Sequence, residues 1–600
     1  MKKVKLLTSI IASSMVTVAI AATTLSPNQN NKSGVIPSGY DDLIFSVSNG
    51  NWVKTITLPS TSKEGALLTI QSTAGLSSEI DLSNVKINKK GFLTLKSGNT
   101  FRFKFTGDKW ELYVAEPENN FNPTKNGNTV PNFSASLAQY SIDDTAWAET
   151  VYLPQNPTND QLLIVKSTAT KTAKIDSQNT LFASSFNLNK NDSYIFQYNQ
   201  KLAKWIPISV PSHIINVQQN DIAAFYQKLQ KLNTPKTEVH FANGAWAPSF
   251  KLPQTANDRD RIVVTSTADW QSVIENVNTN TTATMKLNKG DRYEFIYIGD
   301  KSQWVLISSP KTIINAQQAA QGFTFKTPVV EITADDTQWS PSINLPNSAQ
   351  TGDKVIVSNS AEKAFTVTGT NLSKTLNTGD KIRFVFNNNV WNVDSYQIDL
   401  LIVNSPAVND NLGAIAAKIR AREALRLTNE ALENSQAKAY FREVGYIDHR
   451  IDGTTLGDAI KNGRTDSVVQ AEKTKTGADA IYTITDHSGC GLAWINTTPN
   501  KFNMIGSENY KCGITAMRHE LGHNMGLGHG ESERTTGYHW GFSHPLGSTI
   551  MAGNQIGLYS SPNHYSPEYG VRLGDAEKYD GLRKINENAE TVSKFSAAVK

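Results

Sequence analysis

A tryptophan motif recurs four times in the first two thirds of this 600-residue chain. Each copy has a tryptophan, five intervening residues and Leu-Pro, and each closes with a second tryptophan 58 or, in the last copy, 52 residues after the first. Self-similarity at a near-constant period is the signature of tandem structural repeats. The paired residues are Trp52 and Trp110, Trp147 and Trp205, Trp246 and Trp304, and Trp339 and Trp391.

A second pattern in each copy predicts β-structure. Shortly before the closing tryptophan, a Gly-Asn, Asn-Asp or Gly-Asp pair is followed by large apolar residues at every other position. Such alternation after a turn is typical of a strand with one buried face. The alternating residues are Phe101, Phe103 and Phe105; Tyr194, Phe196 and Tyr198; Tyr293, Phe295 and Tyr297; and Ile382, Phe384 and Phe386. We therefore expect four tandem all-β repeats, each an Ig-like sandwich or small barrel, at 40–115, 138–210, 238–309 and 329–395.

The tryptophans of these repeats allow two interpretations. Eight of the eleven tryptophans follow the repeat, which favours a role in packing the core of each module. An exposed tryptophan on a β-module can instead stack on a sugar ring, and Trp270, outside the pattern, is a candidate for that role. Repetition itself favours binding, because linked weak sites gain avidity.

The N-terminus predicts export. Lys2, Lys3 and Lys5 precede an apolar stretch at 6–20, and small residues follow up to Ala21, so we expect a signal peptide over 1–21 and a secreted protein that passes through the periplasm. About 15 apolar residues are fewer than the ~20 that a membrane anchor needs. Without these three lysines the net charge falls from +4 to about +1, which argues against a nucleic-acid partner.

The sequence changes character after the fourth repeat. A continuous apolar run at 398–403 and a segment at 480–485 are typical of buried strands, and 411–434 has helical spacing. On that helix, Ile415, Ile419, Ala424, Leu425 and Leu432 form the expected buried stripe. This order predicts an α/β domain over 397–600.

Eleven residues in this domain predict a catalytic zinc site. His519 and His523 are four apart, so on a helix they lie on the same face, where both can bind one ion. Gly526 allows the chain to leave the helix, so that His529 can become the third ligand. Three ligands leave a fourth position for a water molecule activated by Zn²⁺, with Glu520 as general base. A bare His-Glu-x-x-His also occurs by chance; the added glycine and third histidine make the pattern specific.

The chain has two cysteines, Cys490 and Cys512, and both lie near this motif. In an exported protein an even pair favours a disulfide over a metal site. Closing a loop of this length stabilises the fold by roughly 3 kcal/mol on the chain-entropy estimate.

At these residues the sequence resembles the metzincin clan of zinc metalloproteases. The resemblance implies a methionine-containing turn beneath the metal, which Met551 fits, and an edge strand that pairs with extended substrate, which Gly491, Leu492, Ala493 and Trp494 fit. Adamalysin-like members usually have Asp after the third histidine, whereas this chain has Gly530.

The whole arrangement resembles the CpaA-like family of type II-secreted, adamalysin-like metzincins and, more distantly, secreted mucinases. This resemblance implies a glycan-dependent endopeptidase that cuts O-glycosylated host proteins beside modified Ser or Thr. We expect the protein to be a monomer. It also implies a membrane-anchored secretion chaperone. The alternative is a glycan-binding adhesin with a secondary, glycan-independent protease activity.

Overall fold

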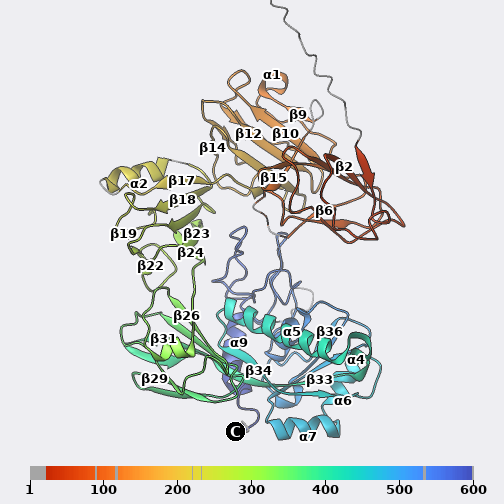
Figure 1. Cartoon of the computed structure of the whole chain (residues 1–600), viewed down its shortest axis with the longest axis vertical. Helices are drawn as coiled ribbons and strands as arrows, with labels where there is room; N and C mark the ends of the chain where they lie inside the picture. Colours follow the sequence, from red (N-terminus) through yellow and green to blue (C-terminus); the bar gives the residue numbers. More distant parts are fainter. Residues whose placement is uncertain are drawn as a thin grey trace, which may run out of the picture. The chain divides into compact units, whose positions relative to one another are not determined.

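The computed structural model describes residues 22–597, except 88, 90, 115–118, 219–220, 232 and 531–535. The predicted signal peptide therefore lies outside the described residues. The chain divides into two compact units, Met1–Pro211 and Ser212–Lys600 (Figure 1). The first unit contains two of the four repeats, and the second contains the other two and the C-terminal domain.

Each repeat is a sandwich of one five-stranded and one three-stranded sheet, as the alternating strands predict. The first repeat contains β1 Thr23–Leu25, β2 Asp42–Val47, β3 Thr55–Thr57, β4 Leu67–Ser72, β5 Ser78–Asp81, β6 Phe92–Leu95, β7 Thr100–Thr106 and β8 Lys109–Leu112. The second contains β9 Asn120–Phe121, α1 Pro123–Asn126, β10 Leu137–Ile142, β11 Thr150–Val151, β12 Leu162–Ser167, β13 Ala173–Ile175, β14 Phe186–Leu188, β15 Ser193–Asn199 and β16 Lys204–Ser209.

The third and fourth repeats have the same plan. The third contains β17 His213–Asn216, α2 Ile222–Lys231, β18 Lys236–Phe241, β19 Ser249–Phe250, β20 Arg261–Ser266, β21 Ser272–Ile274, β22 Met285–Leu287, β23 Arg292–Ile298, η1 Gly299–Lys301 and β24 Gln303–Ser308. The fourth contains β25 Thr312–Asn315, α3 Ala316–Ala320, β26 Val329–Ala334, β27 Ser342–Asn344, β28 Lys354–Asn359, β29 Phe365–Gly369, β30 Leu372–Leu376, β31 Lys381–Asn387 and β32 Val390–Val393.

The recurring tryptophan and Leu-Pro elements meet inside each sandwich. The closing tryptophan is at most 3% exposed in every repeat. Its indole N–H donates to the carbonyl of the motif proline, with N–O distances of 2.8–3.0 Å. The pairs are Trp110 and Pro59, Trp205 and Pro154, Trp304 and Pro253, and Trp391 and Pro346. A buried indole needs this acceptor, which explains why the two elements recur together.

The C-terminal domain is an α/β sheet in the order β34-β33-β35-β37-β36. The first four strands are parallel, and β36 is antiparallel to its neighbour β37. One apolar cluster joins the sheet to α5, α8 and α9, and another joins it to α6 and α7, so helices cover both faces (Figure 1). The elements are β33 Tyr396–Asn404, α4 Pro406–Leu412, α5 Ala414–Asn434, β34 Ala439–Asp448, α6 Leu456–Gly463, α7 Ser467–Thr476, β35 Ala480–Thr485, β36 Gly491–Ala493, η2 Lys501–Asn503, β37 Ile505–Asn509, α8 Ala516–Asn524 and α9 Gly581–Val592.

The long helix of this domain differs from its prediction. Gly413, with φ 84°, separates α4 from α5. Ile415 and Ile419 are 79% and 63% exposed, so their placement on the buried stripe was wrong. The buried face is instead rich in small residues, because α5 packs against α8 as well as the sheet: Ala417, Ala421, Ala424 and Ala431. Within the described part of the chain, no helix is long and apolar enough to cross a membrane.

Ion pairs join the fourth repeat to the C-terminal domain within the second unit. Arg442 of β34 binds Asp399 through two hydrogen bonds of 2.8 Å and also contacts Asp380 of the repeat. Glu433 accepts from Lys381 and Lys311 at 2.6 and 3.0 Å. Arg442 and the three carboxyl groups are mostly buried, so each needs its partner to remain there, whereas the side chain of Lys311 is 45% exposed.

The third repeat contacts a hairpin of the C-terminal domain, residues 561–573. Arg261 donates to the backbone carbonyls of Pro567 and Glu568 at the hairpin tip, both at 2.6 Å. Tyr565 packs in an apolar cluster with Ile296, Ile298 and Val305 of the repeat. Asp300 accepts from Arg572 at 2.9 Å. The hairpin is therefore held by charge, backbone and apolar contacts together.

Candidate metal centre and substrate edge

The helix α8 carries the first two histidines of the motif, and the turn after it returns the third. The N–H of Gly526 donates to the carbonyl of His523 at 2.8 Å as the chain leaves the helix. Gly526 has φ 101°, and a Cβ there would lie 2.7 Å from Nδ2 of Asn588. Both conformation and space require glycine, and this turn brings His529 back to the helix.

The three histidines converge through one nitrogen each. The Nε2 atom of His529 lies 3.0 Å from that of His519 and 3.1 Å from that of His523. Two ligands at a tetrahedral zinc with bonds of about 2.0 Å are separated by about 3.3 Å. Among the described residues, these three form the one group of His, Cys, Asp or Glu side chains that could hold a metal ion.

The other ring nitrogens fix the orientation of two histidines. Nδ1 of His519 lies 2.9 Å from the carbonyl of Ile550, and Nδ1 of His523 lies 2.7 Å from that of Leu527. A carbonyl can only accept, so each Nδ1 carries the proton and each Nε2 presents its lone pair. Burial, with neighbouring His519 adding to it, lowers the pKa of His523 to about 3 in the metal-free protein. A neutral imidazole is the form that binds a metal, so the residues present fit a zinc ion.

Glu520 is buried beside this cluster, with 6% of its surface exposed. Burial first, and then the nearby Glu508, raises the pKa of its carboxyl group to about 8 in the metal-free protein. The start of β36 runs directly against it, since a Cβ on Gly491 would lie 2.2 Å from Oε1 of Glu520. Glycine at this position therefore lets the carboxyl group reach the edge strand.

A second buried carboxyl group lies behind the first, and sequence reasoning missed it. Glu508, on β37, is fully buried and ion-paired with Arg420 of α5. Tyr482 donates to Glu508 at 3.0 Å, and Arg420 also donates to the carbonyl of Cys512 at 3.0 Å. No spacing rule points to Glu508, because its partners Arg420 and Tyr482 come from two segments that are distant in the sequence.

Met551 lies beneath the helix, and is 2% exposed. A Cβ on Gly522, inside the histidine motif, would lie 2.6 Å from its sulfur. The residue before Met551 supplies the carbonyl that receives the His519 Nδ1 contact. The turn thus supports both the helix and one of the histidines.

The strand β36 is the last in the sheet and leaves one edge unpaired among the described residues. It ends at Ala493, so Trp494, which the sequence placed in the edge strand, follows it directly. Leu492 and Trp494 are 41% and 38% exposed, and the guanidinium of Arg464 lies 4.7 Å from the Trp494 ring centroid. A disulfide between Cys490 and Cys512 ties the start of this strand to the loop before α8. An unpaired edge beside the histidines can accept an extended peptide.

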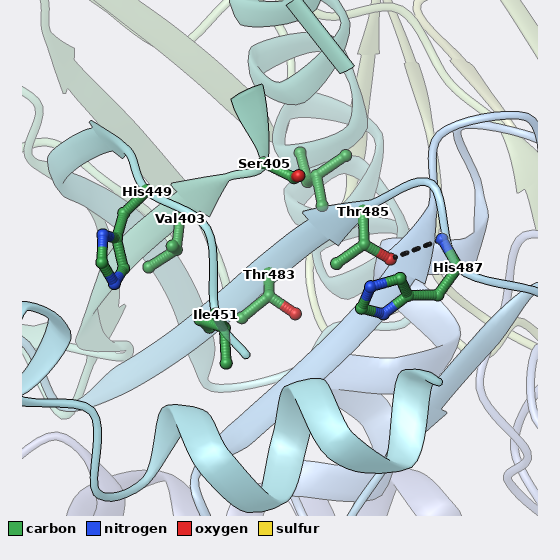
Figure 2. A pocket seen from close by; sticks show the side chains of 8 residues that line it. Val403, Ser405, His449, Ile451, Thr483, Thr485 and His487 are labelled. Carbon is green, nitrogen blue, oxygen red and sulfur yellow. Dashed lines mark hydrogen bonds between the residues drawn. The ribbon is translucent and has the colours of Figure 1, made fainter. Parts of the chain in front are cut away.

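A separate small pocket lies at the carboxyl ends of β33 and β35. Figure 2 shows His449 and His487 on opposite sides of it, with Thr483 between them. None of the three converging histidines lines this pocket. The pocket is therefore separate from the histidine cluster, which is the candidate reaction centre.

Comparisons with known proteins agree with this architecture. The model for the β-sandwich domain of metalloprotease StcE matches four times, and the model for reprolysin-like metallopeptidases of family M12B matches residues 423–530. The four matches to the β-sandwich model cover residues 41–113, 135–209, 234–308 and 327–395. No curated protein matches the chain.

Two solved structures complete the comparison. One, described as a chaperone–substrate complex, contains a chain 41% identical to this one, with a TM-score of 0.81, covering 96% of this chain and 100% of that one. A crystal structure of part of StcE from enterohemorrhagic E. coli is 22% identical, covering 16% of this chain and 87% of that one; its TM-score of 0.13 supports no inference. The chain therefore belongs to the family of metallopeptidases in which StcE-type β-sandwich repeats precede a reprolysin-like M12B domain.

Proposed function

We propose that this protein is a secreted, zinc-dependent endopeptidase of the metzincin clan that cleaves O-glycosylated, mucin-type proteins next to modified Ser or Thr. The observation that carries the proposal is the convergence of three histidine Nε2 atoms beside a buried glutamate and an unpaired strand edge. His519, His523 and His529 would hold the ion, with Met551 beneath them as an apolar floor. When bound, zinc supplies Lewis acidity, which lowers the pKa of water and polarises the scissile carbonyl.

Residues of the chain have the remaining roles, which are substrate binding and proton transfer. The edge strand β36 binds the substrate backbone as an added strand and so fixes the scissile bond over the histidines. Glu520 accepts a proton from the attacking water at its carboxylate and then passes it to the leaving amine.

The glycan part of the proposal rests on the architecture. The four repeats match the β-sandwich model of a metalloprotease, and the whole chain resembles secreted mucinases. The repeats would present or bind the glycosylated substrate. The disulfide supports an oxidising compartment, in agreement with a signal peptide cleaved near Ala21 and export through the periplasm. The similarity to a chain from a chaperone–substrate complex supports a chaperone as a partner. That this chaperone is membrane-anchored and serves the type II secretion machinery is part of the proposal and rests on the resemblance of the sequence alone.

Two measurements test this function. Glu520→Gln should keep one zinc per chain, measured by elemental analysis, and lose cleavage of a mucin by at least about 100-fold. Cleavage by this variant at the parent rate would exclude Glu520 as the base. Incubation of the parent with the same mucin before and after removal of O-glycans, with sequencing of the fragment ends, tests the substrate class. Equal cleavage of both forms would leave a glycan-independent protease and favour the adhesin alternative.

A further inference from the structure

The four repeats share one surface corner, formed by the first tryptophan of each motif. In three repeats its indole N–H donates at 3.1 Å to the backbone carbonyl 24 residues later. These pairs are Trp147 with Lys171, Trp246 with Trp270, and Trp339 with Lys363. The residue before each acceptor donates its N–H to the side chain that lies three residues before the tryptophan. Gly75 makes the same bond, to Asn49, in the first repeat. The second of these bonds is thus common to all four repeats, and the indole bond is common to the second, third and fourth.

The side chain at this position makes the third repeat different. In the second and fourth repeats it is a lysine, whose Nζ lies 3.6 or 5.5 Å from the tryptophan ring centroid. In the third repeat it is Trp270, which is 56% exposed and whose ring centroid lies 6.1 Å from that of Trp246. A lysine ammonium therefore contacts the indole in two repeats, while the third presents two adjoining indoles.

Hydrogen-bonding residues flank this pair in the sequence. Asp269 accepts from Asn243 and from Lys289, both at 2.7 Å, and all three side chains are exposed. Gln271, next to Trp270, donates to Asn288 at 2.8 Å. An amide, a carboxylate and an ammonium group held in place beside an aromatic surface can exchange several hydrogen bonds with vicinal hydroxyl groups.

We propose that the Trp246–Trp270 corner of the third repeat is a carbohydrate-binding site for a pyranose ring. The apolar C–H face of the sugar would lie on the indole of Trp270, and its hydroxyl groups would bind Asn243, Asp269 and Lys289. Large aromatic surface contributes most to such contacts, and the bonded polar groups set the orientation. The site is open, so one ring binds weakly, and affinity grows when a substrate carries many sugars. That the sugar belongs to an O-glycosylated substrate rests on the proposed function.

The other interpretations of this corner fit the structure less well. A core tryptophan would be buried like the closing tryptophans, which are at most 3% exposed. A docking surface for an apolar protein would gain little from the charged Asp269–Lys289 pair beside it, since such charges are depleted at interface centres. A sugar uses both the aromatic face and the polar groups.

The test uses the full-length protein with Glu520→Gln, so that the ligand is not cleaved during the measurement. Binding to immobilised submaxillary mucin, and to the same mucin after chemical removal of its O-glycans, is measured by surface plasmon resonance. Trp270→Lys installs the residue that the second and fourth repeats already have at this position, so the corner should fold. Lys363→Ala is the matched control in the fourth repeat. Trp270→Phe keeps an aromatic ring.

We expect Trp270→Lys to weaken binding to glycosylated mucin about tenfold or more, with Trp270→Phe between it and the parent and Lys363→Ala unchanged. Parent-like binding by Trp270→Lys would overturn the proposal. An equal loss on intact and deglycosylated mucin would also overturn it, because the corner would then bind polypeptide. These results are independent of catalysis: loss of activity in Glu520→Gln tests the proposed protease, whereas this comparison tests the sugar site alone.

Discussion

Replacing Gly491 by alanine places a methyl group where the carboxyl group of Glu520, the proposed base, now lies. The new Cβ would be 2.2 Å from Oε1 of Glu520, so that oxygen must withdraw by about 1.2 Å to reach an ordinary contact of 3.4 Å. The backbone at Gly491 is not left-handed, so alanine adds no conformational strain. Misplacing a reacting group by about 1 Å costs roughly 100-fold in rate, or about 2.7 kcal/mol.

We therefore expect Gly491→Ala to lower kcat about 100-fold while zinc content and melting temperature stay near those of the parent. Steady-state cleavage of a glycopeptide, elemental analysis and calorimetry measure these quantities. Gly513→Ala is the matched control, because its Cβ would lie 3.7 Å from the nearest atom, Oγ1 of Thr515. A parent-like kcat in Gly491→Ala would refute the assignment of Glu520 as a base that must reach the edge strand.

Two further predictions concern stability. Changing both Cys490 and Cys512 to serine should lower the free energy of unfolding of the C-terminal domain by about 3 kcal/mol, measured by denaturant titration; an unchanged midpoint would mean that the 22-residue loop is held without the bond. Burial raises the pKa of Asp260 in the third repeat to about 7. The folded form therefore keeps a proton that the unfolded form releases near pH 4, and stability should fall by about 1–3 kcal/mol as the pH rises from 4 to 8. Asp260→Asn should be at least as stable as the parent throughout this range, and its free energy of unfolding should change less with pH. An identical pH dependence in both proteins would contradict the assignment.

The parts of the fold that depend on residues close together in the sequence could be predicted. The strands β7, β15, β23 and β31 coincide with the alternating aromatic positions, because alternation reports one buried face directly. The bond between each closing tryptophan and its motif proline could not be predicted, since 45 or 51 residues separate the partners. The helix stripe failed at Ile415 and Ile419, because close packing against α8 selects alanine over larger side chains.

The candidate site shows the same difference between features set by nearby residues and features set by distant ones. Two histidines and the glutamate share one helix, and a single glycine turn brings in the third histidine, so spacing alone predicts that they meet. Glu508 and Arg420 act from a strand and a different helix, and the sequence has no local pattern that joins them. Gly491 was expected in the edge strand, but its closeness to Glu520 is a tertiary fact.

The contacts of the hairpin at 561–573 extend the part of the chain that supports the protease domain back into the third repeat. Its base follows Tyr559, whose hydroxyl donates to the carbonyl of Arg518 on α8 at 2.7 Å, while its tip is held by Arg261 of the third repeat. A protease excised at residue 397 would lose the contact of Arg261 with the hairpin tip and the ion pair between Arg442 and Asp380, and would expose Tyr565 to water. The smallest fragment that keeps all of these contacts therefore begins near Ser212, where the second unit starts.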